Sequence, residues 1–148
     1  MKNIVVLLLI LPTLCFGQSV KDMILDGTAF DGNWKLSQPN IIGESAAPNY
    51  IDRTQAHQPV VMIQIIHFAS KEAAKKKMDA LLANEESKQY FKKIAGDREE
   101  YEKTADGQRK RFILIGRYWL TVEQVGDKDD REQFIQKYAK HITAKTEG

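Results

Sequence analysis

The chain has 148 residues, a net charge of +2, 28% charged residues and 43% hydrophobic residues. These fractions are ordinary for a globular protein, so they exclude intrinsic disorder and collagen-like repeats. The length suits one domain, and the near balance of Lys+Arg against Asp+Glu, 22 to 20, provides no overall field that would attract nucleic acid.

The first segment, residues 1–17, has the order of a secretory signal peptide. A lysine precedes the apolar run Ile4 to Leu11, and the small residues Cys15 and Gly17 follow where a signal peptidase requires them. The run is shorter than the roughly 20 residues that cross a bilayer. We therefore expect cleavage after Gly17 and a single exported domain, residues 18–148, in the periplasm or the medium and without a transmembrane segment.

Cys15 leaves an alternative, in which the chain is cut before this cysteine and anchored as a lipoprotein. The bulky side chain of Leu14 argues against it, because lipoprotein signals place a small residue immediately before the cut. Cys15 is the only cysteine of the chain. A domain cut after Gly17 therefore has no disulfide, and its stability must come from burial of apolar side chains.

The first half of the expected domain combines short elements with one long loop. Asp-Gly pairs introduce a strand at 33–36 that carries Trp34. Residues 37–58 are rich in Pro, Asn, Ser and Gly, and they predict the longest irregular stretch, interrupted by one brief strand at 50–52. Long loops of this kind are often functional or mobile in compact domains.

A strand and helical segments follow. Residues 60–68 predict a central strand, because the run is apolar on both faces apart from two positions and is rich in Val and Ile. Ser70 predicts the start of a helix over 71–84, whose apolar residues recur at helical spacing. A further helical stretch is expected over 86–95, ending at Gly96.

Two hairpins give the sharpest local signals. Asp106-Gly107 is typical of a type I′ turn between strands at 100–104 and 109–115, and Gly116-Arg117 suits a type II′ turn that leads into a strand at 118–125. These turns fix the strand register. The expected cross-strand pairs are Ala105–Gln108, Glu102–Arg111, Tyr101–Phe112, Ile113–Leu120, Leu114–Trp119 and Lys110–Glu123.

Residues 129–141 predict a C-terminal helix that begins with a capping-box-like pair. Its buried side is expected to carry Phe134, Ile135, Tyr138 and Ile142. The order of elements predicts an α+β fold: an antiparallel sheet of about four to five strands with two to three helices packed on one face, in ferredoxin-like layering.

The usual catalytic motifs do not occur in the sequence. The serines after the signal peptide lie in neither Gly-x-Ser-x-Gly nor Ser-x-x-Lys. His57, His67 and His141 fall on different predicted elements, so a hydrolase would have to be assembled from dispersed residues, with His67 as its base. The glycines are scattered and predict no phosphate-binding loop.

Metal and nucleic-acid sites are not predicted either. Asp127, Asp129 and Asp130 resemble the start of a calcium loop, but Arg131 and Glu132 stand where that loop needs an oxygen ligand and a glycine. The acids suit the positive end of the following helix dipole instead. The lysine runs are interleaved with acids, so we expect no nucleic-acid partner, no metal and no cofactor.

What remains is a candidate recognition surface. Phe112, Leu114 and Trp119 share the hairpin face opposite the one assigned to the core, and Trp34 and Tyr118 lie near turns. The alternative is that the N-terminal segment, Gly32 to Tyr50, packs over this face and buries it. The sequence thus predicts an exported, non-enzymatic binding module for an envelope protein or an apolar small ligand; the alternatives are a small hydrolase and an oligomeric structural component of the envelope.

Overall fold

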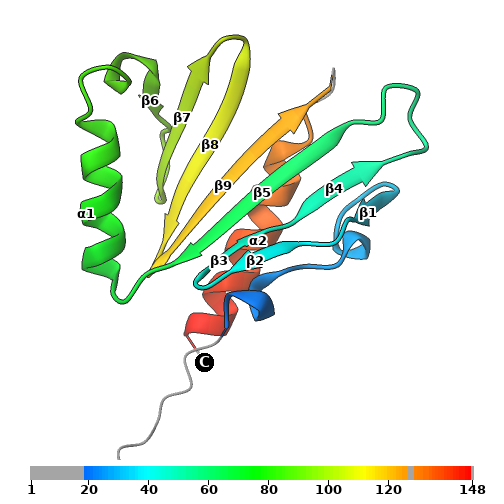
Figure 1. The fold of residues 1–148 in the computed structure, drawn as a ribbon, viewed down its shortest axis with the longest axis horizontal. Coiled ribbons are helices and arrows are strands. Elements are labelled where there is room, and N and C mark those ends of the chain that lie inside the picture. The colour runs from blue at the N-terminus through cyan, green and yellow to red at the C-terminus, as the bar shows by residue number, and fades with distance from the viewer. Residues whose placement is uncertain (1–18, 127–128, 148) are drawn as a thin grey trace, which may run out of the picture.

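The computed structural model describes residues 19–126 and 129–147 (Figure 1). The expected signal peptide at 1–17, with Cys15, lies outside the described residues, as does Asp127 of the calcium-loop comparison. The strands are β1 Trp34–Leu36, β2 Asn40–Ile42, β3 Ser45–Ala47, β4 Asn49–Asp52, β5 Val60–His67, β6 Phe91–Lys93, β7 Glu99–Ala105, β8 Gln108–Ile115 and β9 Tyr118–Val125.

Two α-helices and three 3₁₀ turns accompany these strands. The helices are α1 Lys71–Leu82 and α2 Arg131–Thr146, and the turns are η1 Val20–Met23, η2 Gly27–Ala29 and η3 Lys88–Tyr90. Ser70 accepts a hydrogen bond from the amide of Ala73, which confirms the predicted cap of α1. No helix in 19–126 or 129–147 combines the length and the apolar character needed to cross a bilayer.

All described strands belong to one antiparallel sheet with the order β1-β4-β5-β9-β8-β7-β6, and the β2–β3 hairpin joins it through β5. The expected ferredoxin-like sheet of four to five strands is therefore wrong: the described residues form nine strands with only two α-helices. In the 37–58 segment, the brief strand expected at 50–52 is confirmed as β4, but the remainder, expected to be loop, also contributes β2 and β3. These two strands have three residues each, too few for a periodic pattern to be recognised.

The expected second helical stretch, 86–95, is also wrong, because it contains the η3 turn and the edge strand β6. Its apolar residues are spaced as in a helix, yet β6 pairs with β7, with Phe91 opposite Lys103. The Phe91 ring also packs against Phe112, with 5.4 Å between the ring centres. Pairing with a distant strand thus outweighed the local helical pattern.

The two long hairpins are confirmed with their predicted register. Across β7–β8, Tyr101 lies opposite Phe112, and across β8–β9, Leu114 lies opposite Trp119. Asp106 and Gly107 have φ of 52° and 75°, the left-handed pair that a type I′ turn requires. The local turn chemistry was therefore sufficient to place the side chains on the two faces.

The helices lie on opposite faces of the sheet, contrary to the predicted single helical layer. Ile113 faces α2 and belongs to the main core, together with four α2 side chains. Leu114, the next residue, faces the other side, as do its cross-strand partners Glu99 and Trp119. Lys75 of α1 donates to Glu99 at 3.0 Å, which places α1 on that side. Figure 1 shows α2 behind the sheet and α1 away from α2, on the side of β6 and β7.

The N-terminal segment packs on the α2 face, where aromatic rings dominate the core. Phe30 stacks on Phe134 with 3.9 Å between ring centres. The Tyr138 hydroxyl donates to Tyr50, whose own hydroxyl donates to the carbonyl of Leu25 at 2.6 Å. Burial raises the pKa of both tyrosines, that of Tyr138 to about 12. The phenols therefore remain neutral and satisfied within the core.

Candidate functional site

The five side chains predicted to form a recognition surface are divided between the two faces of the sheet. Trp34 and Tyr118 are buried in the α2-side core, with 5% and 0% of each residue exposed. Trp34 donates its indole N–H to the carbonyl of Asp31 at 3.1 Å. These two aromatic side chains are therefore part of the hydrophobic core, and the five residues do not form one exposed patch.

The other three, Phe112, Leu114 and Trp119, lie together on the α1 side. Leu114 and Trp119 are buried there, with 8% and 7% exposed, and Phe112 is half-buried. Phe112 continues a row of rings from Phe91 to Trp119 and Phe68, with successive centres 5.4, 5.9 and 6.2 Å apart. The buried indole Nε1 of Trp119 has no hydrogen-bond partner. We call these four rings the aromatic row.

Part of this face is not covered by α1. Gln64, Thr121 and Phe112 stand side by side across β5, β9 and β8, and Gln64 is exposed. Met62 and Ile66 flank Gln64 on the same face of β5 and are half-buried. We call Met62, Gln64, Ile66 and Phe112 the open face. It places apolar side chains beside the aromatic row and within reach of solvent.

A pocket of about 250 Å³ borders the open face at Phe112. Its walls come from the β7–β8 hairpin and from β9: Lys103, Ala105, Asp106, Gln108, Lys110 and Glu123. Lys110 and Glu123 form an ion pair with 2.6 Å between nitrogen and oxygen. A small ligand here would meet an apolar ring on one side and polar groups on the other, which is the usual composition of a binding pocket.

His67, the base considered for a hydrolase, lies on the α2 face beside Tyr118. Glu44, in the turn between β2 and β3, bonds the Nδ1 atom of His67, and the two rings stack with 4.8 Å between centres. A carboxylate on Nδ1 fixes the ring orientation, as in many catalytic histidines. The Nε2 atom is buried and has no hydrogen-bond partner. Glu44 therefore orients the His67 ring as a general base requires, but a substrate cannot reach the buried Nε2 atom in this conformation.

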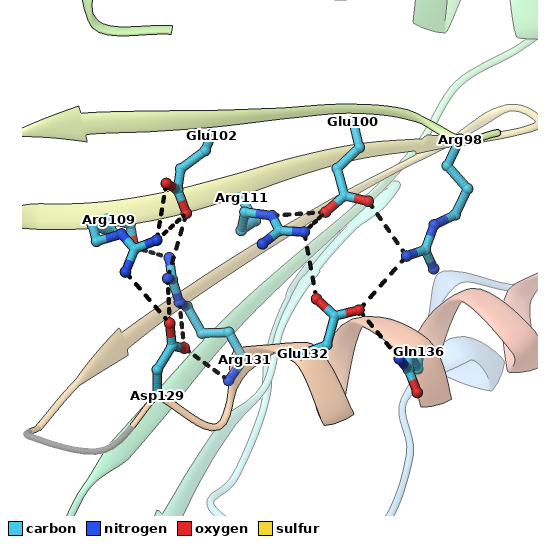
Figure 2. A network of polar contacts seen from close by, with 9 residues as sticks. All are labelled: Arg98, Glu100, Glu102, Arg109, Arg111, Asp129, Arg131, Glu132 and Gln136. Atoms are coloured by element: carbon cyan, nitrogen blue, oxygen red, sulfur yellow. Dashed lines mark hydrogen bonds and ion pairs between the residues drawn. The ribbon is translucent and has the colours of Figure 1, made fainter. Parts of the chain in front are cut away.

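The most extensive polar cluster is an ion network between the start of α2 and the β7–β8 hairpin (Figure 2). It joins Arg98, Glu100, Glu102, Arg109, Arg111, Asp129, Arg131 and Glu132. Glu100 and Arg131 are buried, with 3% of each exposed. Arg111 bonds Glu100, and Arg131 contacts Asp129 at 2.6 Å.

Four arginines and four carboxylates balance each other in this network. Hydrogen bonds from Arg131 hold the pKa of Asp129 at about 2. A pocket of about 380 Å³ adjoins Arg98, and four of its charged lining residues, Arg98, Glu100, Arg111 and Glu132, are already paired with one another. The network thus clamps α2 to the sheet and presents no unpaired acid and base for catalysis.

Metal ligation has no supporting geometry in the part of the chain that the structure describes: no three His, Cys, Asp or Glu side chains are grouped so as to hold an ion. Asp129 and Asp130 of the calcium-loop comparison lie at the start of α2, where Asp129 pairs with Arg131. Both aspartates therefore help to organise the start of α2.

Sequence reasoning missed the contribution of β5 to the open face. The 60–68 run is apolar on both faces apart from Gln64 and His67, which predicts a central strand but does not show which face meets solvent. The exposed Gln64 is the signal that could have indicated a face in contact with solvent, because a fully buried strand seldom contains an unpartnered polar side chain. Comparison of the chain with protein-family models, with curated proteins and with solved structures found no match.

Proposed function

We propose that this protein is a non-enzymatic binding module exported to the cell envelope, and that the open face receives a protein partner or an apolar small ligand. The observation that carries the proposal is the group of half-buried apolar side chains, Met62, Ile66 and Phe112, around the exposed Gln64. Apolar side chains within reach of solvent on a sheet face, with the Lys110–Glu123 ion pair beside them, are typical of interaction sites.

The position of the open face also supports binding. It lies on the rigid centre of the sheet, since β5 pairs with β9 over all eight of its residues. Trp119 is adjacent, 5.9 Å from Phe112 between ring centres, so a ligand on the open face would alter its surroundings. A preformed surface on paired strands costs little ordering entropy when a partner binds.

Photocrosslinking in the native host tests the proposal. A benzophenone side chain in place of Gln64 is expected to give one discrete adduct, with a protein or with a lipid-like molecule. The control places the same group at Lys137, which is exposed on α2. Phe112→Ser should weaken the adduct from position 64, because it removes apolar surface from the open face. The absence of an adduct from position 64, or equal adducts from both positions, would contradict the proposal.

The Glu44–His67 pair favours one second candidate, a small hydrolase with His67 as the base. A panel of activated esters and amides tests it. Turnover should fall in both Glu44→Gln and His67→Gln, since one variant loses the orienting carboxylate and the other the base. Turnover that is absent, or unchanged in both variants, would eliminate this candidate. The third alternative, an oligomeric structural component, would be eliminated by a monodisperse monomer in light scattering.

A further inference from the structure

The methionines in the described part of the chain differ sharply in their exposure. Met23 and Met78 are fully buried, with 0% of each residue exposed. Met62 of β5 is half-buried and belongs to the open face. Cys15, the only cysteine, lies in the expected signal peptide, so the predicted mature domain contains no thiol. Of the described sulfur-containing side chains, Met62 is thus the one within reach of a dissolved oxidant.

Met62 stands in the middle of the apolar surface to which the open face belongs. Val60 lies two residues before it and faces the same side of the sheet, because strand residues alternate between the two faces. Val125 of β9 is opposite Val60 and is 54% exposed. Apolar side chains therefore continue from Met62 toward Ile66 in one direction and toward Val60 and Val125 in the other. A partner that covers the open face has to cover Met62.

Polar side chains flank Met62 on the same face of the sheet. Asn49 of β4 is paired with it on one side and Glu123 of β9 on the other, and directly opposed residues have their Cβ atoms about 5 Å apart. Gln64 follows on β5 and is exposed. The amide groups of Asn49 and Gln64 are hydrogen-bond donors that an oxygen atom on the sulfur of Met62 could use. A more polar side chain at this position is therefore compatible with the fold.

Met23 and Met78 occupy the interior instead. Met23 belongs to the main core on the α2 side, and Met78 is one of the two buried side chains of α1. An oxygen atom added to either sulfur would place a polar group in apolar surroundings, which is costly unless the group is hydrogen-bonded. An oxidant also reaches these two sulfur atoms only when the fold opens. The folded protein therefore directs oxidation to Met62.

We propose that Met62 is a redox-sensitive modification site and that its oxidation by a peroxide weakens binding at the open face; this regulation rests on the proposed function. With hydrogen peroxide, the Met62 sulfur attacks one oxygen and the O–O bond breaks. The displaced hydroxide takes the proton of the transferred oxygen and leaves as water, so the thioether is oxidised to the sulfoxide and the peroxide is reduced.

The sulfoxide changes the chemistry of the open face. It replaces a flexible apolar side chain by a polar one in the middle of the apolar surface, so a partner loses apolar contact there. Methionine sulfoxide reductases reverse the oxidation, which makes the change suitable for regulation.

Hydrogen peroxide treatment of the folded full chain, followed by peptide mass spectrometry, tests the assignment of the site. Met62 should gain one oxygen atom at least about tenfold faster than Met23 and Met78, because those two react only when the fold opens. In denaturant all three should react at similar rates, which controls for intrinsic reactivity. Reaction of Met23 or Met78 as fast as Met62 in the folded protein would overturn the proposal, whatever binds to the open face.

Photocrosslinking from position 64 in the native host tests the consequence for binding. Peroxide treatment of the cells should reduce the adduct about fivefold, since the apolar contact of one half-buried thioether is lost. Met62→Leu keeps the apolar volume and has no sulfur to oxidise, so this matched control should give the same adduct before and after treatment. Met62→Gln, which mimics the polar sulfoxide, should give the reduced adduct without peroxide.

The outcomes separate this regulation from the proposed function. An equal effect of peroxide on the unmodified protein and on Met62→Leu would overturn the regulation, as would a full-strength adduct from Met62→Gln. A missing adduct from position 64 in every variant would contradict the proposed function, whereas the oxidation rates would still decide whether Met62 is the reactive site. Circular dichroism of the oxidised protein and of both variants should match that of the unmodified protein, because position 62 is only half-buried.

Discussion

Removal of the Glu100 carboxylate is expected to destabilise the fold by about 2–3 kcal/mol, because it leaves a partly buried arginine without its main partner. The Glu100 side chain is 4% exposed and that of Arg111 is 14% exposed. Loss of one member of a buried pair costs about 3–5 kcal/mol in general. The cost expected for Glu100→Gln lies at or just below the lower end of this range, because Arg111 retains Glu132 at 3.5 Å and reaches some solvent. For a domain of this size the midpoint of thermal unfolding should fall by about 10 °C.

Urea unfolding followed by circular dichroism measures this cost. The control is Glu85→Gln, which removes a carboxylate that is 82% exposed and paired with Lys88; it should change the free energy of unfolding by less than about 0.5 kcal/mol. Replacing both members, with Glu100→Leu and Arg111→Met, should recover part of the loss, since no buried charge is then left unpaired. A cost for Glu100→Gln no larger than that of Glu85→Gln would refute the clamp role of the ion network.

Three further changes test the core. Burial raises the pKa of Tyr138 from 10.0 to about 12, so the stability that its neutral phenol contributes is fully present below pH 10 and is lost as the pH rises toward 12. Tyr138→Phe should reduce this alkaline loss of stability, and an unchanged pH dependence of the urea midpoint would contradict the prediction. A Cβ at Gly27 would lie 2.2 Å from the carbonyl oxygen of Trp34, so Gly27→Ala should cost about 1–3 kcal/mol in urea unfolding, and a neutral effect would show that the turn adapts freely. Met78 of α1 is fully buried, so Met78→Ala should cost about 2–5 kcal/mol and shift tryptophan emission to the red, whereas unchanged stability and emission would mean that α1 does not seal its face of the sheet.

The parts of the fold that sequence predicts well are those specified by neighbouring residues. The turns at 106–107 and 116–117 set the register of β7, β8 and β9, because a two-residue turn of known type allows only one pairing. The C-terminal helix carried a clear apolar stripe, and Phe134 and Tyr138 are buried as predicted. These elements need no information from distant parts of the chain.

The parts that sequence does not predict depend on distant partners. Strands β2 and β3 form because they pair with each other and β3 pairs with β5, and β6 forms because it pairs with β7. The same reason limits prediction of the site. Alternation placed Phe112 and Trp119 on one face correctly, but nothing local indicated that α1 would cover Trp119 while leaving Phe112 half-buried.

Solvent paramagnetic relaxation of side-chain methyl groups tests the open face most directly. A soluble gadolinium chelate should relax the methyl groups of Met62 and Ile66, which are half-buried on the open face. It should spare those of Ile63 and Ile65, which alternate with them and are 2% and 0% exposed. Equal protection of all four methyl-bearing side chains would show that another part of the chain covers this face, and would contradict its assignment as a recognition surface.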